Sequence, residues 1–207
     1  MDPQQLGNPG GGSQQSARSS QYARFGADVL SRMEKVPSEL LALTYGSLIT
    51  QLMEDLHSDT QQMNDALDRM GEQMGARLVD EFLAKTQNIV TSFPLCCQDF
   101  PDLCEIIATV GFKMYLGVAA EVANVSEKSC DFILRENPLS EFVEIPAELQ
   151  SGGLWYSNIL AGAVRGALAA VGVRTRVYFV EDVTRDDNDI TRIACELIEY
   201  MVDEFDD

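Results

Sequence analysis

One segment, residues 101–117, constrains the fold more than any other, because the helix it predicts has almost no polar face. Apolar or small side chains cover nearly every side of that helix, and a helix that is apolar all round must be buried. Pro101 suits a first helical turn, while Asp102 and Glu105 lie near the positive end of the helix dipole. We therefore expect this helix to begin near Pro101 and to lie in the centre of the domain.

Two adjacent cysteines, Cys96 and Cys97, precede this helix by a few residues. A thiol at the edge of a buried apolar element can carry an acyl chain and direct it into the interior, where each buried methylene contributes about 0.8 kcal/mol. The alternative is a free thiol in a loop. On spacing alone, both interpretations stay open.

The composition excludes several classes of function. The formal net charge is -18 and the isoelectric point is about 4.3, whereas binding to nucleic acid or to anionic lipid needs clustered Lys and Arg. The sequence has no apolar run long enough to span a membrane, no apolar signal segment, and Asp2 where N-myristoylation needs glycine. Its five cysteines, an odd number without a secretory signal, indicate reduced thiols in a cytoplasmic chain.

The beginning of the chain has low complexity. Residues 1 to about 20 are rich in Gly, Gln, Ser and Pro, and contain too little apolar surface to offset the entropy of ordering. Apolar spacing within residues 22–36 indicates a short helix. We place a disordered low-complexity extension over residues 1–30 and a single domain over residues 31–207.

Two long helices follow. Ser38 is the predicted N-cap of the first, whose apolar residues recur at helical spacing as far as Leu56. The second covers about residues 60–86, and its apolar seam alternates steps of three and four, which suits packing along another helix or a partner subunit. Gly71 and Gly75 lie one turn apart in it. Glycine costs about 1 kcal/mol in a helix interior, so we expect close backbone contact there, within the chain or with a partner.

The second half of the chain changes period. Residues 130–135 and 141–146 predict two strands around a turn, and residues 155–171 predict a helix whose small residues pack onto a sheet. Residues 173–182 predict another strand. The segment from Ile190 fits either a helix or a strand, and hairpin pairing favours the strand. The order predicts an α+β fold, a helical layer packed on a twisted four-stranded antiparallel sheet.

Several short motifs, in order along the chain, carry a resemblance to a known family. They are LTYGSL at 43–48, DRMG at 68–71, GARL at 75–78, CQDF at 97–100, FKMYLG at 112–117, ENPL at 136–139, YSN at 156–158 and RGAL at 165–168. From about residue 38 to the C-terminus, the chain resembles the small core subunits of the trafficking protein particle (TRAPP) complex, and among these the acylated subunit.

The resemblance implies that the first two long helices form the interface of a homodimer or heterodimer. On this chain the implied interface residues are Leu48, Met63, Leu67, Met70, Gly71, Met74 and Gly75.

The resemblance also implies a covalent palmitate, held as a thioester, and no metal. The cysteine of the Cys-x-Asp-Phe motif is Cys97, with Cys96 as the second candidate, and the implied acyl tunnel is lined by Leu103, Ile107, Ala108 and Gly111. Burying a sixteen-carbon chain contributes at most on the order of 12 kcal/mol. Such a chain would fill the core and would be a poor membrane anchor.

The function implied is that of a non-catalytic, acylated core subunit of a vesicle-tethering complex. The complex acts between endoplasmic reticulum and Golgi and supports guanine-nucleotide exchange on a Rab GTPase. The implied partners are other TRAPP small subunits, the Rab GTPase and, through the complex, the Golgi membrane, with a cytoplasmic location peripheral to the cis-Golgi and endoplasmic reticulum. Possible GTPase contacts are the C-terminal residues Glu204, Phe205, Asp206 and Asp207, whose carboxylates would compete for Mg²⁺.

Other classes of function remain as alternatives. The first is a stand-alone lipid- or small-ligand-binding module of similar fold. A haem sensor would need His57, the only histidine, as its proximal ligand, and an enzyme would need Cys97 paired with His57 as nucleophile and base. The cysteines lack the paired spacing of a zinc site. We expect neither catalysis nor a metal.

Overall fold

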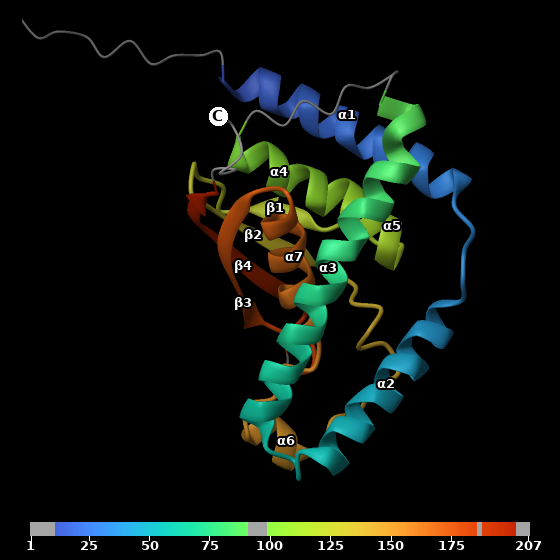
Figure 1. Ribbon diagram of the computed structural model, residues 1–207, viewed down its shortest axis with the longest axis vertical. Coiled ribbons are helices and arrows are strands. Elements are labelled where there is room, and N and C mark those ends of the chain that lie inside the picture. The colour runs from blue at the N-terminus through green and yellow to red at the C-terminus, as the bar shows by residue number, and fades with distance from the viewer. Residues whose placement is uncertain (1–10, 91–98, 186–187, 202–207) are drawn as a thin grey trace, which may run out of the picture.

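The computed structural model describes residues 11–90, 99–185 and 188–201, with the backbone alone for residues 11–18 and 87–90. Figure 1 shows the elements in order along the chain. The helices are α1 (Gly11–Arg32), α2 (Ser38–Asp55), α3 (Thr60–Val90), α4 (Phe100–Ile106), the π-helix η1 (Ile107–Gly111), α5 (Phe112–Leu116), α6 (Ala147–Ser151) and α7 (Ile159–Ala170). The strands are β1 (Glu121–Ala123), β2 (Ser129–Leu134), β3 (Val173–Glu181) and β4 (Thr191–Tyr200).

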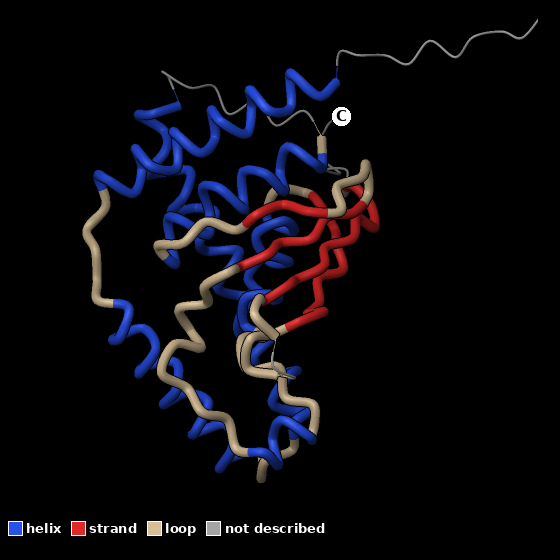
Figure 2. Tube along the Cα trace, turned by 180° about the vertical axis from the view of Figure 1, so that it is seen from behind, coloured by secondary structure: helices blue, strands red, loops and turns tan. Residues whose placement is uncertain are grey.

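The four strands form one antiparallel sheet in the order β1-β2-β4-β3. Figure 2 shows the twisted sheet at one side of the molecule, with helices on its inner face. Burial alternates along β2 and β3, as expected where one sheet face meets the core and the other meets solvent. The predicted α+β fold class is confirmed, including the strand assignment of the last segment.

The helices form layers on this sheet. Helices α7 and α4 contact the sheet directly, α3 packs along α7, and α1 lies across η1 on the outside (Figure 1). The predicted central helix is the continuous helical run α4–η1–α5, which lies between α1 and the sheet. It ends at Gly117, whose φ of +78° is the left-handed conformation that glycine adopts at a helix C-terminus.

Helices α3 and α7 meet through glycines from both sides. A Cβ atom at Gly71 or Gly75 would collide with the backbone of α7, and one at Gly162 or Gly166 would collide with the backbone of α3. The guanidinium of Arg165 then reaches across to the carboxylates of Asp68 and Glu72. The close backbone contact predicted at Gly71 and Gly75 therefore lies within the chain, between α3 and α7. The small residues of α7 face α3, not the sheet as predicted.

Two predictions of secondary structure are wrong. Residues 141–146 form turns and loop, not a strand, and Phe142 there has a φ of +69°, which no strand accommodates. The fourth strand is instead the short β1, which precedes β2. Ser38 is also not the N-cap of α2, because Pro37 holds that position and no side chain caps the helix.

The N-terminal extension differs from its prediction as well. Helix α1 runs from Gly11 to Arg32, and it buries Tyr22, Phe25 and Val29 against Ile106 and Val110 of the central helical run. Disorder as far as residue 30 is therefore wrong for the described part, because these three side chains provide enough apolar surface to order it. Residues 1–10 lie outside the described residues.

Candidate functional site

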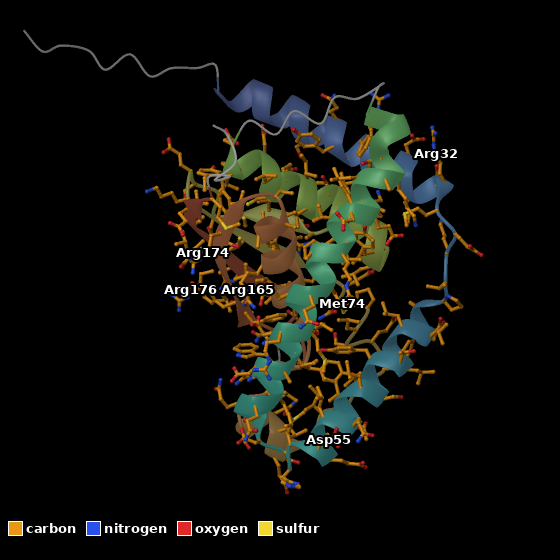
Figure 3. The ribbon with its side chains drawn as sticks, viewed as in Figure 1. Arg32, Asp55, Met74, Arg165, Arg174 and Arg176 are labelled. Atoms are coloured by element: carbon orange, nitrogen blue, oxygen red, sulfur yellow. The ribbon has the colours of Figure 1, made fainter. Side chains whose placement is uncertain are left out.

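A cavity of about 460 Å³ lies where α2, α3, the α4–η1–α5 run and α7 meet. This volume is within the range of small-ligand pockets. Its lining consists of aliphatic and aromatic side chains with one glycine, and none of the described lining residues is charged. In Figure 3 the side chains of α2 and α3 point into the space between these helices, and the labelled Met74 lies on α3 beside it.

Among the lining residues that the structure describes, two tyrosines carry the only side-chain polar groups, and both hydroxyls are already hydrogen-bonded. Tyr45 donates to the backbone carbonyl of Tyr156 at 2.5 Å, and Tyr115 donates to that of Leu78 at 2.7 Å. Burial raises the pKa of both hydroxyls well above the usual value, so both stay protonated donors. The described part of the wall thus offers a ligand no free hydrogen-bonding side chain, and such a cavity favours an apolar occupant.

The central helical run supplies most of the residues predicted to line the acyl tunnel. Leu103, Ile107 and Gly111 line the cavity, and a Cβ atom added at Gly111 would have no neighbour within 4 Å. Ile107 and Gly111 are the two ends of the π-helix, a feature often found at functional sites. Ala108, also predicted, is not among the residues that line this cavity: it is fully buried in the main core, and its carbonyl accepts a hydrogen bond from the backbone N–H of Ala120.

The other walls were not predicted from the sequence. Helix α3 contributes Leu78 and Phe82, and α7 contributes Ala163 and Ala167. Leu78 and Phe82 belong to the apolar seam of their helix, but the seam does not show whether a side chain faces a cavity or a neighbour. The small side chains on α7 are the signal that could have indicated a hollow.

The candidate acylation residues Cys96 and Cys97 lie outside the described residues. In the sequence they are followed by Phe100, the first residue of α4. The carboxylate of Asp99 caps this helix by accepting the backbone N–H of Asp102 at 3.0 Å. The same helix lines the cavity one turn later, at Leu103.

The predicted interface residues divide into two groups. Met63 and Leu67 are fully buried in the chain's own core, and Gly71 and Gly75 pack against α7, so all four make contacts within the chain. The remaining three, Leu48, Met70 and Met74, are partly or well exposed on α2 and α3.

The remaining predicted site residues do not contribute to the cavity in the described part of the structure. The C-terminal residues Glu204 to Asp207 lie outside the described residues. His57 is exposed in the turn after α2, with a φ of +52°. Within residues 11–90, 99–185 and 188–201, no group of acidic, histidine or cysteine side chains is arranged to hold a metal ion, and no helix is long and apolar enough to cross a membrane.

Comparison with known proteins gives this cavity its context. A family model for transport protein particle (TRAPP) components matches residues 41–196. The chain belongs to this family. The predicted resemblance is thus confirmed. As a member of this family, the TRAPP chain is a component of a trafficking complex.

Two relatives show how far the similarity of this TRAPP chain extends. Trafficking protein particle complex subunit 3 of Dictyostelium discoideum is 43% identical over 172 residues, which are 82% of this chain and 88% of the relative. Transport protein particle subunit bet3 of Schizosaccharomyces pombe is 41% identical over 167 residues, 80% of this chain and 86% of the relative.

One similar solved structure was determined with a bound ligand. It is a trafficking protein particle complex subunit 3 from Naegleria fowleri covalently bound to palmitic acid, and it superposes on this TRAPP chain with a TM-score of 0.73 and 40% sequence identity. The similarity covers 82% of this chain and all of the other.

Proposed function

We propose that Cys97 carries a palmitoyl thioester whose acyl chain occupies the cavity between α3, α7 and the α4–η1–α5 run. The observation that carries this proposal is the apolar cavity of about 460 Å³ lined by Leu103 and Gly111, which belong to the helical run that follows the two cysteines in the sequence. The relative from Naegleria fowleri, described as covalently bound to palmitic acid, supports the same chemistry. Cys96 is the second candidate for the thioester.

The chemistry of the wall favours a thioester over a free fatty acid. A free carboxylate is charged at neutral pH, and burying it without a partner is strongly unfavourable. None of the described lining residues offers a cation or a free hydrogen-bond donor to it. A thioester carries no charge, so its acyl chain fills the cavity without that cost.

An intact-mass measurement on the purified full-length chain tests this assignment. We expect one acyl mass on the wild type, lost on treatment with neutral hydroxylamine, which cleaves thioesters. Cys97→Ser should lack the acyl mass, while the matched Cys96→Ser variant should keep it. A lipid that leaves on denaturation without hydroxylamine would instead indicate a module that binds free lipid.

We further propose that this TRAPP chain is a non-catalytic core subunit that binds other small TRAPP subunits through α2 and α3. The apolar residues exposed there, Leu48, Met70 and Met74, are the candidates for contact, in a homodimer or heterodimer. Met74 is about half exposed (48%) and also lines the cavity, so the acyl chain and the interface would share a wall. Met70→Glu combined with Met74→Glu should prevent co-purification with a partner subunit, whereas Arg69→Glu should not.

The assembled complex would tether vesicles between endoplasmic reticulum and Golgi and support nucleotide exchange on a Rab GTPase, at the cytoplasmic face of these membranes. The acidic residues Glu204, Asp206 and Asp207, with Phe205, are proposed to approach the nucleotide and compete for Mg²⁺. Deleting residues 204–207 should slow nucleotide release by the reconstituted complex. Unchanged release would remove the tail from the proposal.

A further inference from the structure

Helix α1 packs on the outside of the wall that contains the π-helix η1. It precedes residues 41–196, the part of the chain that the family model matches. In Figure 1 it crosses the α4–η1–α5 run on the outside of the molecule. The run therefore contacts α1 on one side, while Ile107 and Gly111 of η1 line the acyl cavity on another.

The apolar face of α1 is buried in a cluster of its own, apart from the main core. The fully or largely buried members of this cluster are Tyr22, Phe25, Val29, Ile106, Val110 and Met114. Ile106 also lines the acyl cavity, as do Phe82 and Tyr115, which pack against the cluster. Helix α1 and an acyl chain would therefore share part of one wall.

Gly26 brings the backbone of α1 onto the middle of the π-helix. A Cβ atom at Gly26 would lie 2.5 Å from the carbonyl oxygen of Thr109 and 3.3 Å from the Cα atom of Val110. Two turns earlier in α1, the hydroxyl of Ser19 donates a hydrogen bond of 2.6 Å to the carboxylate of Glu105, which fixes α1 along the run. A side chain at position 26 would push α1 away from η1, because it would meet backbone atoms in a packed contact.

The π-helix is the part of the wall that most needs support from outside. Turns of π-helix are rare, and an uncommon backbone conformation persists where the surrounding structure holds it. On the cavity side, a Cβ atom added at Gly111 would meet no atom within 4 Å, whereas the backbone of α1 lies directly against Thr109. The docked α1 therefore supports the shape of the wall beside which the acyl chain is proposed to lie.

Helix α1 is attached in a way that allows it to open separately from the rest of the domain. Residues 33–37 join it to α2, and in this link Val36 is 72% exposed. Elements with few buried apolar contacts open at a lower free energy than the whole domain unfolds. Because only three large side chains of α1 are buried, we expect α1 to detach while the sheet, α3 and α7 stay folded.

We propose that α1 is a strap on the acyl cavity: when docked it keeps the η1 wall closed over the acyl chain, and when released it lets solvent reach the chain and its thioester. This inference rests on the proposed palmitoyl thioester. It assigns the segment before residue 41 a role in retaining the lipid, and it makes release of α1 a step that exposes the lipid without unfolding the domain.

Gly26→Leu compared with Ala27→Leu tests the strap on the full-length acylated chain. Position 26 faces the backbone of η1, whereas Ala27 is exposed on the same helix, so the two variants place leucine at neighbouring positions with different surroundings. Neutral hydroxylamine should remove the acyl mass from folded Gly26→Leu at least about tenfold faster than from wild type, since cleavage follows the population of the opened form. Ala27→Leu should stay within about twofold of wild type.

A thiol reagent separates release of α1 from unfolding of the domain. Cys104 is fully buried in the main core, so it should stay unlabelled in Gly26→Leu. If it is labelled, the milder Phe25→Ala takes the place of Gly26→Leu and should speed acyl removal at least about fivefold. Equal rates for the position-26 or position-25 variant and Ala27→Leu, in protein whose Cys104 stays protected, would overturn the inference.

A chain that carries both Cys96→Ser and Cys97→Ser tests the strap without a thioester. The neutral fluorophore N-phenyl-1-naphthylamine should enter its cavity at least about fivefold faster when Gly26→Leu is added than when Ala27→Leu is added. Absence of an acyl mass from the wild type would refute the thioester alone, and the fluorophore would then decide on the strap. Equal entry rates would overturn it.

Discussion

The hydroxyl of Tyr115 donates a hydrogen bond of 2.7 Å to the backbone carbonyl of Leu78, and so ties α5 to α3 beside the acyl cavity. Both residues also line that cavity. This hydrogen bond fixes two walls of the cavity relative to each other. It also satisfies the side-chain hydroxyl of Tyr115, which is then not available to a ligand. A third wall, α7, is fixed to α3 by the glycine contacts, so the cavity is built between elements that are held together independently of any ligand.

Replacing this tyrosine tests the tie directly. Tyr115→Phe should lower the free energy of unfolding by about 1–2 kcal/mol, because the carbonyl of Leu78 loses its side-chain donor. Chemical denaturation of the purified chain measures this difference. Tyr200→Phe, at an exposed position of β4, is the matched control and should change stability little.

The same substitution at two glycines should have opposite effects. Gly71→Ala places a Cβ atom against the carbonyl of Ile159 in α7, and overpacking of this kind destabilises by about 1–3 kcal/mol. Gly111→Ala places a Cβ atom in open space within a helical segment, and should stabilise the chain by up to about 1 kcal/mol. Thermal unfolding of the two variants compares them, and equal destabilisation would contradict the assigned surroundings of Gly111.

A larger side chain at Gly111 should block the acyl chain. Gly111→Leu directs four carbons into the cavity, so the fraction of molecules that carry an acyl mass should fall at least about threefold relative to Gly111→Ala. Intact mass spectrometry of both variants, expressed identically, measures the fraction. Equal acylation of the two would show that the chain does not pass Gly111.

The cysteines should differ sharply in reactivity. Cys104, Cys130 and Cys195 are at most 1% exposed, and hydrogen bonding to the neighbouring Cys130 and Cys195 thiols, together with burial, raises the pKa of Cys104. Since thiolates react and thiols do not, a native thiol titration should label no more than the other two of the five cysteines. Acylated protein should show one reactive thiol, and hydroxylamine should release a second. Fast native labelling of Cys104 would contradict the burial of this cluster.

The carboxyl of Asp182 should make the free energy of unfolding depend on pH, with a sign that follows from its raised pKa. Burial raises the pKa of this carboxyl, and its Oδ2 atom has no hydrogen-bond partner among the described residues. A carboxyl whose folded pKa lies above its unfolded value binds more protons in the folded state, so its contribution weakens as pH rises from about 4. The difference in unfolding free energy between Asp182→Asn and wild type should therefore shift in favour of the variant between pH 4 and pH 7. A constant difference would show that the carboxyl is solvated.

Periodicity predicted the elements that are long and regular. The stripes of α2 and α3, the alternation of β3 and the apolar faces of the central helical run all gave the correct type of element. The exceptions have local causes: β1 has only three residues, too few for a period, and the apparent strand at 141–146 is interrupted by the positive φ of Phe142. A sequence pattern records which side chains are apolar, but a left-handed backbone at a phenylalanine leaves no trace in it.

Apolar periodicity also predicted part of the cavity wall, but not the cavity itself. Leu103, Ile107 and Gly111 follow from the helix after the cysteines, but a pattern of apolar residues does not distinguish a filled core from a hollow one. Met63 and Met70 share one seam of α3, yet the first is in the core and the second is at the surface. Which part of a seam is covered depends on α7, whose position is set by contacts distant in sequence.

Electron density from crystals of the purified full-length chain tests the proposed acylation most directly. We predict continuous density from the sulfur of Cys97 along Leu103 and Ile107 to the open space beside Gly111. A cavity filled by rearranged side chains, with an unmodified sulfur at position 97, would contradict it.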